Sequence, residues 1–381
     1  MPPSPSVPGS ESPVPPSKRR LSHKSKLLIA GLGFPTLLLI LAAGYTSVKM
    51  PQARFVDRIL TQANPDKWWR LHFSIDLPFR DEEKAEFYFY DHLPIGWKWK
   101  FFGNVKLIYM EQPFITPEDL RTIGHLPHLE NLFVYVTPEV GEADLNSLTH
   151  LPNLKYLGLH GLSNFTDEGM ETLSRIKSLQ YLSISPMRAV TPAGYAKLQS
   201  LPNLRKIAVV TTTVTGQTMR TILDLPVLSE LDIKDSELTD EATERLVGSN
   251  LKMVYLIDVK APPEMFHRFA DFEGLYTFAA YKPGLLPPDA FNGFAGRSKL
   301  GQVWITTDEV DPAMFREIVK IETLEHLALP KARITDADLE HLYGHPKLGY
   351  VNLPKHISAA AIQKLKSKSP RLGVDQQQPQ D

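Results

Sequence analysis

The stretch ITDADLEHLYGHPKLGYVNL, residues 334–353, contains one complete structural unit, a helix followed by a strand. Thr335 suits the capping position of a helix, and Leu339 and Leu342 fall on one face of that helix. The apolar residues that follow at strand-like spacing are Leu348, Val351 and Leu353. A helix and a strand this short cannot bury both of their apolar faces alone, so the fold depends on what packs against them.

Similar units precede this one along most of the chain. The clearest copies are LPNLKYLGLHG from residue 151, LPNLRKIAVVT from 201 and LPVLSELDIKD from 225, and each fits the pattern L-x-x-L-x-L. The first position of the pattern recurs every 23 to 25 residues, at Val105, Leu129, Leu154, Leu179, Leu204, Leu228, Leu251, Leu275, Leu300, Leu324 and Leu348. Eleven copies with so little drift predict an array of repeated structural units.

The helical half of the unit repeats as well. A residue suited to a helix start follows each strand: Thr116, Gly141, Thr166, Thr191, Thr215, Thr239, Pro262, Pro287, Asp311, Thr335 and Ser358. Four residues later comes an apolar position, with Thr243 as its one exception: Leu120, Leu145, Met170, Tyr195, Met219, Phe266, Phe291, Phe315, Leu339 and Ile362. The sequence therefore predicts one strand and one helix in every copy.

Residues 105–372 resemble the leucine-rich repeat family, whose copies of 20–29 residues each contribute one strand and one helix. LTDEATERL (238–246) and ITDADLEHL (334–342) are similar to its ribonuclease-inhibitor-like bacterial type. The resemblance implies an α/β solenoid, or horseshoe, with parallel strands on the concave face and helices on the convex face. The family usually has Asn eight residues after the first Leu, whereas this chain has Thr137, Thr212, Ser236 and Ala332 there. Other groups, or the backbone and water, must therefore join adjacent turns.

The first fifty residues predict a membrane anchor. Residues 1–26 are rich in Pro and Ser and hold five basic residues against one acid, which indicates a disordered basic tail on the cytoplasmic side. Residues 27–48 contain no charge and are long enough to form a transmembrane signal-anchor helix. The repeat domain of this single-pass membrane protein would then lie on the extracytoplasmic side. The alternative is a cleaved signal peptide.

Two further segments flank the repeats. Residues 51–104 hold four of the five tryptophans and are expected to form an N-terminal cap, which solenoids require. The alternative for this segment is an aromatic belt at the membrane surface. Residues 373–381 are expected to be a disordered tail.

The sequence offers no constellation for catalysis. It has no cysteine, no phosphate-binding or nucleophile-elbow motif and no metalloprotease motif. His341 and His345 are four residues apart, but Gly344 and Pro346 place His345 beyond the helix end. We therefore predict no enzyme activity, no catalytic residue, no cofactor and no metal. Residues 51–381 hold 36 basic and 42 acidic residues, a net charge of −6, which predicts no nucleic-acid partner.

The residues between the inward leucines should face the concave side, where exposed aromatics are typical of protein-binding surfaces. We predict partner contacts in two groups, together with Tyr350. The first group comprises Phe133, Tyr135, Tyr156 and Tyr181, and the second comprises Tyr255, Tyr276, Tyr281 and Trp304. The alternative is that tyrosine simply suits strands, or that rings of the second group are buried in distorted repeats.

These observations favour a membrane-anchored, non-catalytic binding protein. It would use its concave face to recognise an unknown protein, peptide or glycan, with the membrane contacted through residues 27–48. One alternative is a structural or assembly protein of the cell envelope that uses residues 51–104 as its contact. A more remote alternative is an enzyme with an unrecognised site.

Overall fold

The computed structural model describes residues 106–376, apart from 263, 282–285, 297–298 and 308–309. It also describes one antiparallel pair of short strands, β1 (Phe73–Ser74) and β2 (Glu86–Phe87). The expected cytoplasmic tail and membrane anchor lie outside the described residues. Among the described residues, no helix combines the length and apolar character that crossing a bilayer requires.

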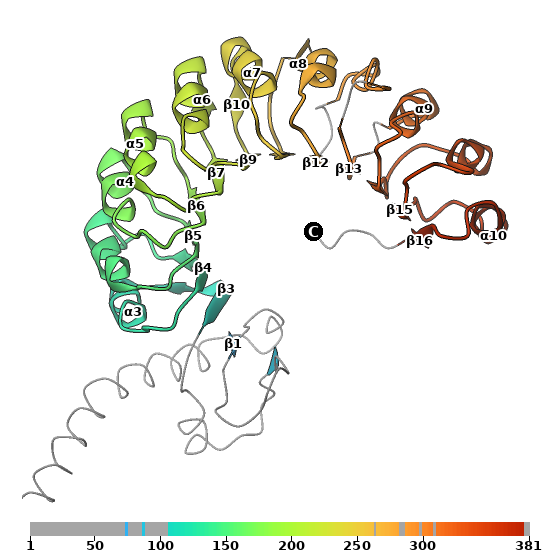
Figure 1. Ribbon diagram of the computed structural model, residues 1–381. Helices are drawn as coiled ribbons and strands as arrows, with labels where there is room; N and C mark the ends of the chain where they lie inside the picture. Colours follow the sequence, from blue (N-terminus) through green and yellow to red (C-terminus); the bar gives the residue numbers. More distant parts are fainter. Residues whose placement is uncertain are drawn as a thin grey trace, which may run out of the picture. The chain divides into compact units, whose positions relative to one another are not determined.

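The repeats form one parallel sheet of twelve strands that follow each other in chain order, so the predicted α/β solenoid is confirmed. Figure 1 shows the strands on the inner side of the curved repeat region and the helices on its outer side. The strands are β3 (Leu107–Ile115), β4 (Asn131–Val136), β5 (Tyr156–His160), β6 (Tyr181–Ser185), β7 (Lys206–Val210), β9 (Glu230–Lys234), β11 (Met253–Ile257), β12 (Thr277–Tyr281), β13 (Gln302–Ile305), β14 (His326–Ala328), β15 (Tyr350–Asn352) and β16 (Gly373–Asp375).

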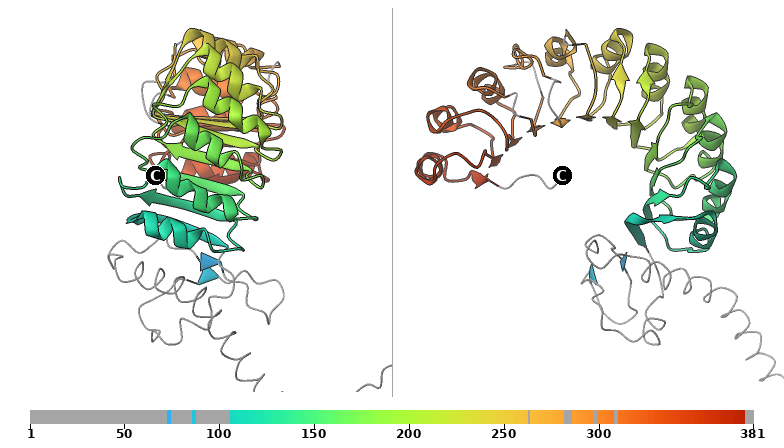
Figure 2. Two further views of the ribbon diagram at one scale, coloured as in Figure 1. Left: turned by 90° about the vertical axis from the view of Figure 1, so that its left-hand side faces the viewer. Right: turned by 180° about the vertical axis from the view of Figure 1, so that it is seen from behind.

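The outer side carries helices, several of them short. These are α3 (Pro117–Ile123), η2 (Glu142–His150), α4 (Asp167–Leu173), α5 (Pro192–Lys197), η3 (Leu198–Ser200), α6 (Gly216–Leu223), α7 (Asp240–Val247), α8 (Glu264–Arg268), η4 (Phe269–Asp271), α9 (Pro312–Val319), η5 (Asp336–Leu342) and α10 (Ala359–Lys368). Figure 2 shows the same succession of strand and helix from two further sides. A second, smaller sheet pairs β8 (Thr213–Val214) with β10 (Glu237–Leu238) near the outer side.

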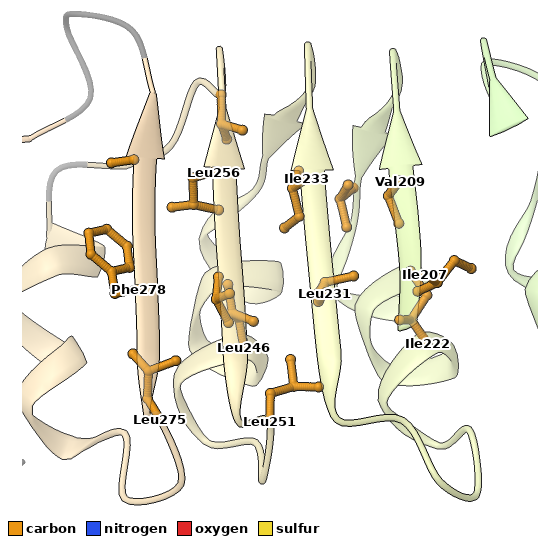
Figure 3. Close-up of a cluster of buried hydrophobic side chains, with 14 of the residues drawn as sticks. Ile207, Val209, Ile222, Leu231, Ile233, Leu246, Leu251, Leu256, Leu275 and Phe278 are labelled. Atoms are coloured by element: carbon orange, nitrogen blue, oxygen red, sulfur yellow. The ribbon is translucent and has the colours of Figure 1, made fainter. Parts of the chain in front are cut away.

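The core lies between the strands and the helices, and it is built from the positions that the periodicity predicts. Leu231 and Ile233 of β9 and Leu246 of α7 are buried, and Figure 3 shows equivalent side chains meeting in adjacent repeats. In the unit of residues 334–353, Leu339 from the helical side and Val351 from the strand side are both fully buried. Each repeat therefore shares one continuous apolar core with its neighbours.

Two helical predictions need correction. The repeat at Pro287 has no helix over residues 286–296 but a series of turns, because Gly293 has a φ of 85° and Gly296 a φ of 74°. The rings of Phe291 and Phe294, 5.1 Å apart, fill the space on the core side. The helices at 142–150 and 336–342 are 3₁₀ rather than α-helical.

Carboxylates at the first helical residue join several of the successive turns. Glu142 accepts hydrogen bonds from the backbone N–H groups of Thr166 and Gly169, the latter at 2.9 Å. One repeat further on, Asp167 accepts from the N–H of Thr191 at 2.8 Å. Asp336 likewise accepts from the N–H of Ser358 at 2.9 Å. The first residue of one helix thus caps the helix of the next repeat.

The C-terminal end of the sheet extends further than predicted. β16 pairs with β15 in parallel, with Val374 opposite Val351. The prediction that a disordered tail begins at residue 373 is therefore wrong for 373–375, while residues 377–381 lie outside the described residues. The last strand covers the apolar end of the preceding repeat.

Candidate partner-binding surface

The strand register aligns the side chains between the apolar anchors into rows across the concave face. The central row runs through Tyr109, Phe133, Gly158, Ser183, Ala208, Asp232, Tyr255, Ala279, Trp304, Ala328 and Asn352, as the sequence periodicity predicts. Successive side chains of a strand point to opposite faces, so the buried anchors and these residues alternate. The face is therefore a set of rigidly spaced positions.

The first aromatic group divides into two clusters. The Phe133 ring lies 6.0 Å from that of Tyr109 and 5.8 Å from that of Tyr181. Gly158 makes this approach possible, because a Cβ there would lie 2.3 Å from Phe133 Cδ1. Tyr135 stands apart and stacks on His160, with ring centroids 5.0 Å apart.

Tyr135 and Tyr156 are the exposed members of this first group, at 39% and 40% of their full accessibility. Phe133 and Tyr181 are half-buried. An incoming partner can therefore contact two largely exposed rings, while the other two support the surface around them.

A charged cluster in the middle of the face connects the two predicted aromatic groups. Lys206 Nζ lies 3.0 Å from Oδ1 of the buried Asp232, and Lys234 Nζ lies 3.6 Å from its Oδ2. The same Lys206 ammonium lies 5.4 Å from the ring centroid of Tyr181 and 4.6 Å from that of Tyr255. Both distances allow a cation–π interaction, so one lysine holds the two rings around one carboxylate.

This environment shifts the acidity of its neighbours. Burial first, and the Asp232 charge second, raise the pKa of Tyr181 to about 12. Burial and then the same charge raise the pKa of Tyr255 to about 12, and they also raise the pKa of Tyr281. Burial first and the Lys234 charge second lower the pKa of His160. At neutral pH the three phenols are therefore protonated donors, and the imidazole is uncharged.

The second aromatic group is spread over several positions. Tyr255, Tyr281 and Trp304 are half-buried in their strands, and Trp304 lies in register between the buried Ala279 and Ala328. Tyr276 lies at the strand entrance, before β12, and its hydroxyl donates to Glu325 Oε2 at 2.7 Å. A Cβ at Gly301 would lie 2.1 Å from Cε2 of the Tyr276 ring, so that ring crosses the intervening repeat. Tyr276 thus connects repeats of this chain.

Tyr350 lies near the C-terminal end of the face. Its ring centroid is 6.0 Å from that of His326, and its hydroxyl lies 3.5 Å from Asp375 Oδ2. These contacts place Tyr350 in a cluster separate from the central one.

The sequence-based site omits the three charged residues of the centre: Lys206, Asp232 and Lys234. A signal for them is present in ELDIK, residues 230–234, where charges alternate with two core residues. Within the described part of the chain, no group of three His, Asp or Glu residues is arranged to hold a metal ion. His345 instead bonds to backbone, with Nε2 3.2 Å from the Ile321 carbonyl oxygen and Nδ1 accepting from the N–H of Leu348.

Comparisons with known proteins add solved structures of low similarity. No protein-family model matches the chain, and no curated protein matches it. A crystal structure of a Rad7 and Elc1 complex in yeast matches with 13% identity over 72% of this chain and 81% of that chain, with a TM-score of 0.36. A crystal structure of a TLR13–ssRNA13 complex matches with 15% identity over 72% of this chain and 47% of that chain, with a TM-score of 0.38. Both TM-scores lie below 0.5, so neither likeness bears on the function of this chain.

Proposed function

We propose that this chain is a non-catalytic binding protein that recognises a protein, peptide or glycan with the concave face of its solenoid. We further propose that residues 27–48 hold it in a membrane, with the repeats on the extracytoplasmic side. The observation that carries the binding role is the central cluster, in which Tyr181, Tyr255 and Lys206 surround Asp232 on adjacent strands.

The geometry of this cluster favours recognition. Its side chains lie on paired strands and already contact one another. The protein would therefore lose little conformational freedom when it binds a partner. Tyrosine and tryptophan supply large contact areas, and the protonated phenols supply hydrogen-bond donors.

A capture experiment with the full chain in lipid nanodiscs tests the binding role. Trp304→Ala and Tyr255→Ala are expected to weaken capture of a membrane-derived partner by about tenfold or more each, as loss of a central aromatic contact does. Tyr343→Ala is the matched control, because Tyr343 lies on the helical side, near Lys364 of α10. Unchanged capture by both Trp304→Ala and Tyr255→Ala would contradict the proposed binding role. Loss only on changing Trp97 and Trp99 would favour the assembly role of residues 51–104.

Protease access tests the membrane arrangement. In cells that make the full chain, protease added from outside is expected to cleave the repeat domain once any outer barrier is opened. Cleavage only after the inner membrane is lysed would place the repeats on the other side and overturn this arrangement.

A further inference from the structure

A change in loop length divides the solenoid between β6 and β7. Six residues, 186–191, lead from the end of β6 to the cap of α5, whereas five residues, 211–215, lead from β7 to the cap of α6. The preceding loop, 161–166, also has six residues, and the following loop, 235–239, also has five. Loops of equal length can align with each other, but the loops after β6 and β7 cannot.

The strand pairing is shorter at this step. β5 and β6 pair over five residues, and so do β7 and β9, but β6 and β7 pair over three and stop at Ser183 and Ala208. Pro186 follows β6 and has no N–H to donate, so the bond to the Val210 carbonyl comes from Met187 instead. The ladder therefore ends earlier here than between the neighbouring strands, although the Met187 N–H still joins this loop to the end of β7.

The outer pairing has the same interruption. Ala189 bridges back to Thr166, and Thr213 pairs forward with Glu237, which in turn bridges to Lys260. Within the described residues no bridge joins the segments of Ala189 and Thr213. β8 is therefore an edge strand that faces the loop of the preceding repeat.

The open side of β8 presents unused main-chain groups. Glu237 N–H donates to Thr212 O at 3.0 Å, and Thr239 N–H donates to Val214 O at 3.1 Å. Because alternate residues of a parallel strand bond to opposite neighbours, the N–H and C=O of Thr213 point away from β10. Among the described residues, the N–H and C=O of Thr213 have no hydrogen-bond partner, and neither do the hydroxyls of Thr211, Thr212 and Thr213.

A cavity of about 740 Å³ lies at this site. The loop of β6 contributes Arg188 and Val190 to its lining, and the loop of β7 contributes Thr211 and Thr213. The following repeats contribute three carboxylates and one further cation: Asp235, Glu237, Asp258 and Lys260. This volume is within the range of ligand sites in proteins. The hydroxyls and the unpaired strand edge suit a ligand that carries its own alternating N–H and C=O groups.

We propose that this cavity is a second binding site, distinct from the concave face, which takes an extended peptide segment beside β8. The peptide's main chain bonds to the N–H and C=O of Thr213 and occupies the position that the mismatched loop leaves unfilled.

Panning of a random heptapeptide library on the full chain in nanodiscs tests this site, with Thr213→Val and Thr213→Pro as the matched pair. Valine keeps the N–H and loses the hydroxyl, whereas proline loses the N–H that no ladder bond uses. Selected peptides are expected to bind wild type and Thr213→Val within about threefold and to bind Thr213→Pro about tenfold more weakly. Trp304→Ala is expected to leave binding unchanged.

Hydrogen exchange on the wild-type chain gives a result that does not depend on the proline variant folding. The Thr213 amide is expected to exchange rapidly in the free protein and to become protected when a selected peptide is added. No enriched peptide, equal binding to the proline variant, or no added protection at Thr213 would each overturn the proposal. Binding lost in Trp304→Ala would place the peptides on the concave face and would likewise overturn it.

Discussion

At the scale of single residues, Asp232 determines the chemistry of the concave face. Its carboxylate contacts two lysines, and its charge contributes to the raised pKa values of Tyr181, Tyr255 and Tyr281. A buried carboxylate is stable only when it is paired, so Lys206 and Lys234 are part of the fold as well as of the surface. A partner that displaced either lysine would leave this charge without its compensation.

His160 gives a pH-dependent prediction. Its folded pKa is lowered, mainly by burial, so protonation favours the unfolded chain. The stability that the neutral imidazole contributes is complete above the ordinary histidine pKa of about 6.5 and is lost as the pH falls through the lower folded value. His160→Gln is therefore expected to lose less stability than wild type between pH 7 and pH 5.

Urea unfolding at several pH values measures this difference. Burial also lowers the pKa of His345, which is present in both proteins. The slope of unfolding free energy against pH is therefore expected to become shallower in His160→Gln without disappearing. Parallel curves for wild type and His160→Gln would contradict the assignment.

At the scale of elements, the helices depend on their neighbours. Helices such as α5 and α8 are too short to be stable alone. The first turn of α5 is capped from within by Thr191, and Asp167 of the preceding repeat accepts the Thr191 N–H. Gly194 leaves room for this device, because a Cβ there would lie 2.2 Å from Asp167 Oδ1. The carboxylate connections thus couple the helical side as the sheet hydrogen bonds couple the strand side.

Asp167 tests the coupling of adjacent helices. Asp167→Ala removes the acceptor of the Thr191 N–H and hydroxyl and is expected to cost about 1 kcal/mol of unfolding free energy. Glu168→Ala is the control, because Glu168 is an exposed acid in the same helical turn and has the same favourable position near the helix N-terminus. Chemical denaturation measures both variants. If they lost equal unfolding free energy, the contribution of Asp167 would come from its charge alone and not from its bonds to Thr191.

At the scale of the whole molecule, the solenoid is a linear array in which each repeat is stabilised by its neighbours. The repeat of residues 286–296 lacks a helix and relies on a cluster of phenylalanine rings, with Phe278 and Phe291 6.0 Å apart. The connection of this repeat to its neighbours therefore depends on these rings rather than on a helix.

Phe291→Ala is expected to separate the unfolding of the two ends. The change removes a buried ring at a cost of about 3–5 kcal/mol, and scanning calorimetry should then show two transitions. Phe165→Ala is the matched control, since Phe165 is the same residue, is equally buried at 2% exposure and lies between helical repeats. Phe165→Ala should lower the temperature of a single unfolding transition. One transition in both variants would show that the array unfolds cooperatively through residues 286–296.

The sequence by itself determined the repeat, its strand register and its core, because a period near 24 residues with apolar anchors admits one way of burying them. It also indicated which residues face the concave side. The tertiary structure decided what those residues contact: Tyr276 bonds across two repeats, and Lys206 joins two aromatic groups that are far apart in the chain. It also showed that, where adjacent loops differ by one residue, β8 pairs with β10 on one side and has no partner strand on the other. These features arise from contacts between repeats, and such contacts depend on side-chain reach and loop length rather than on the period itself.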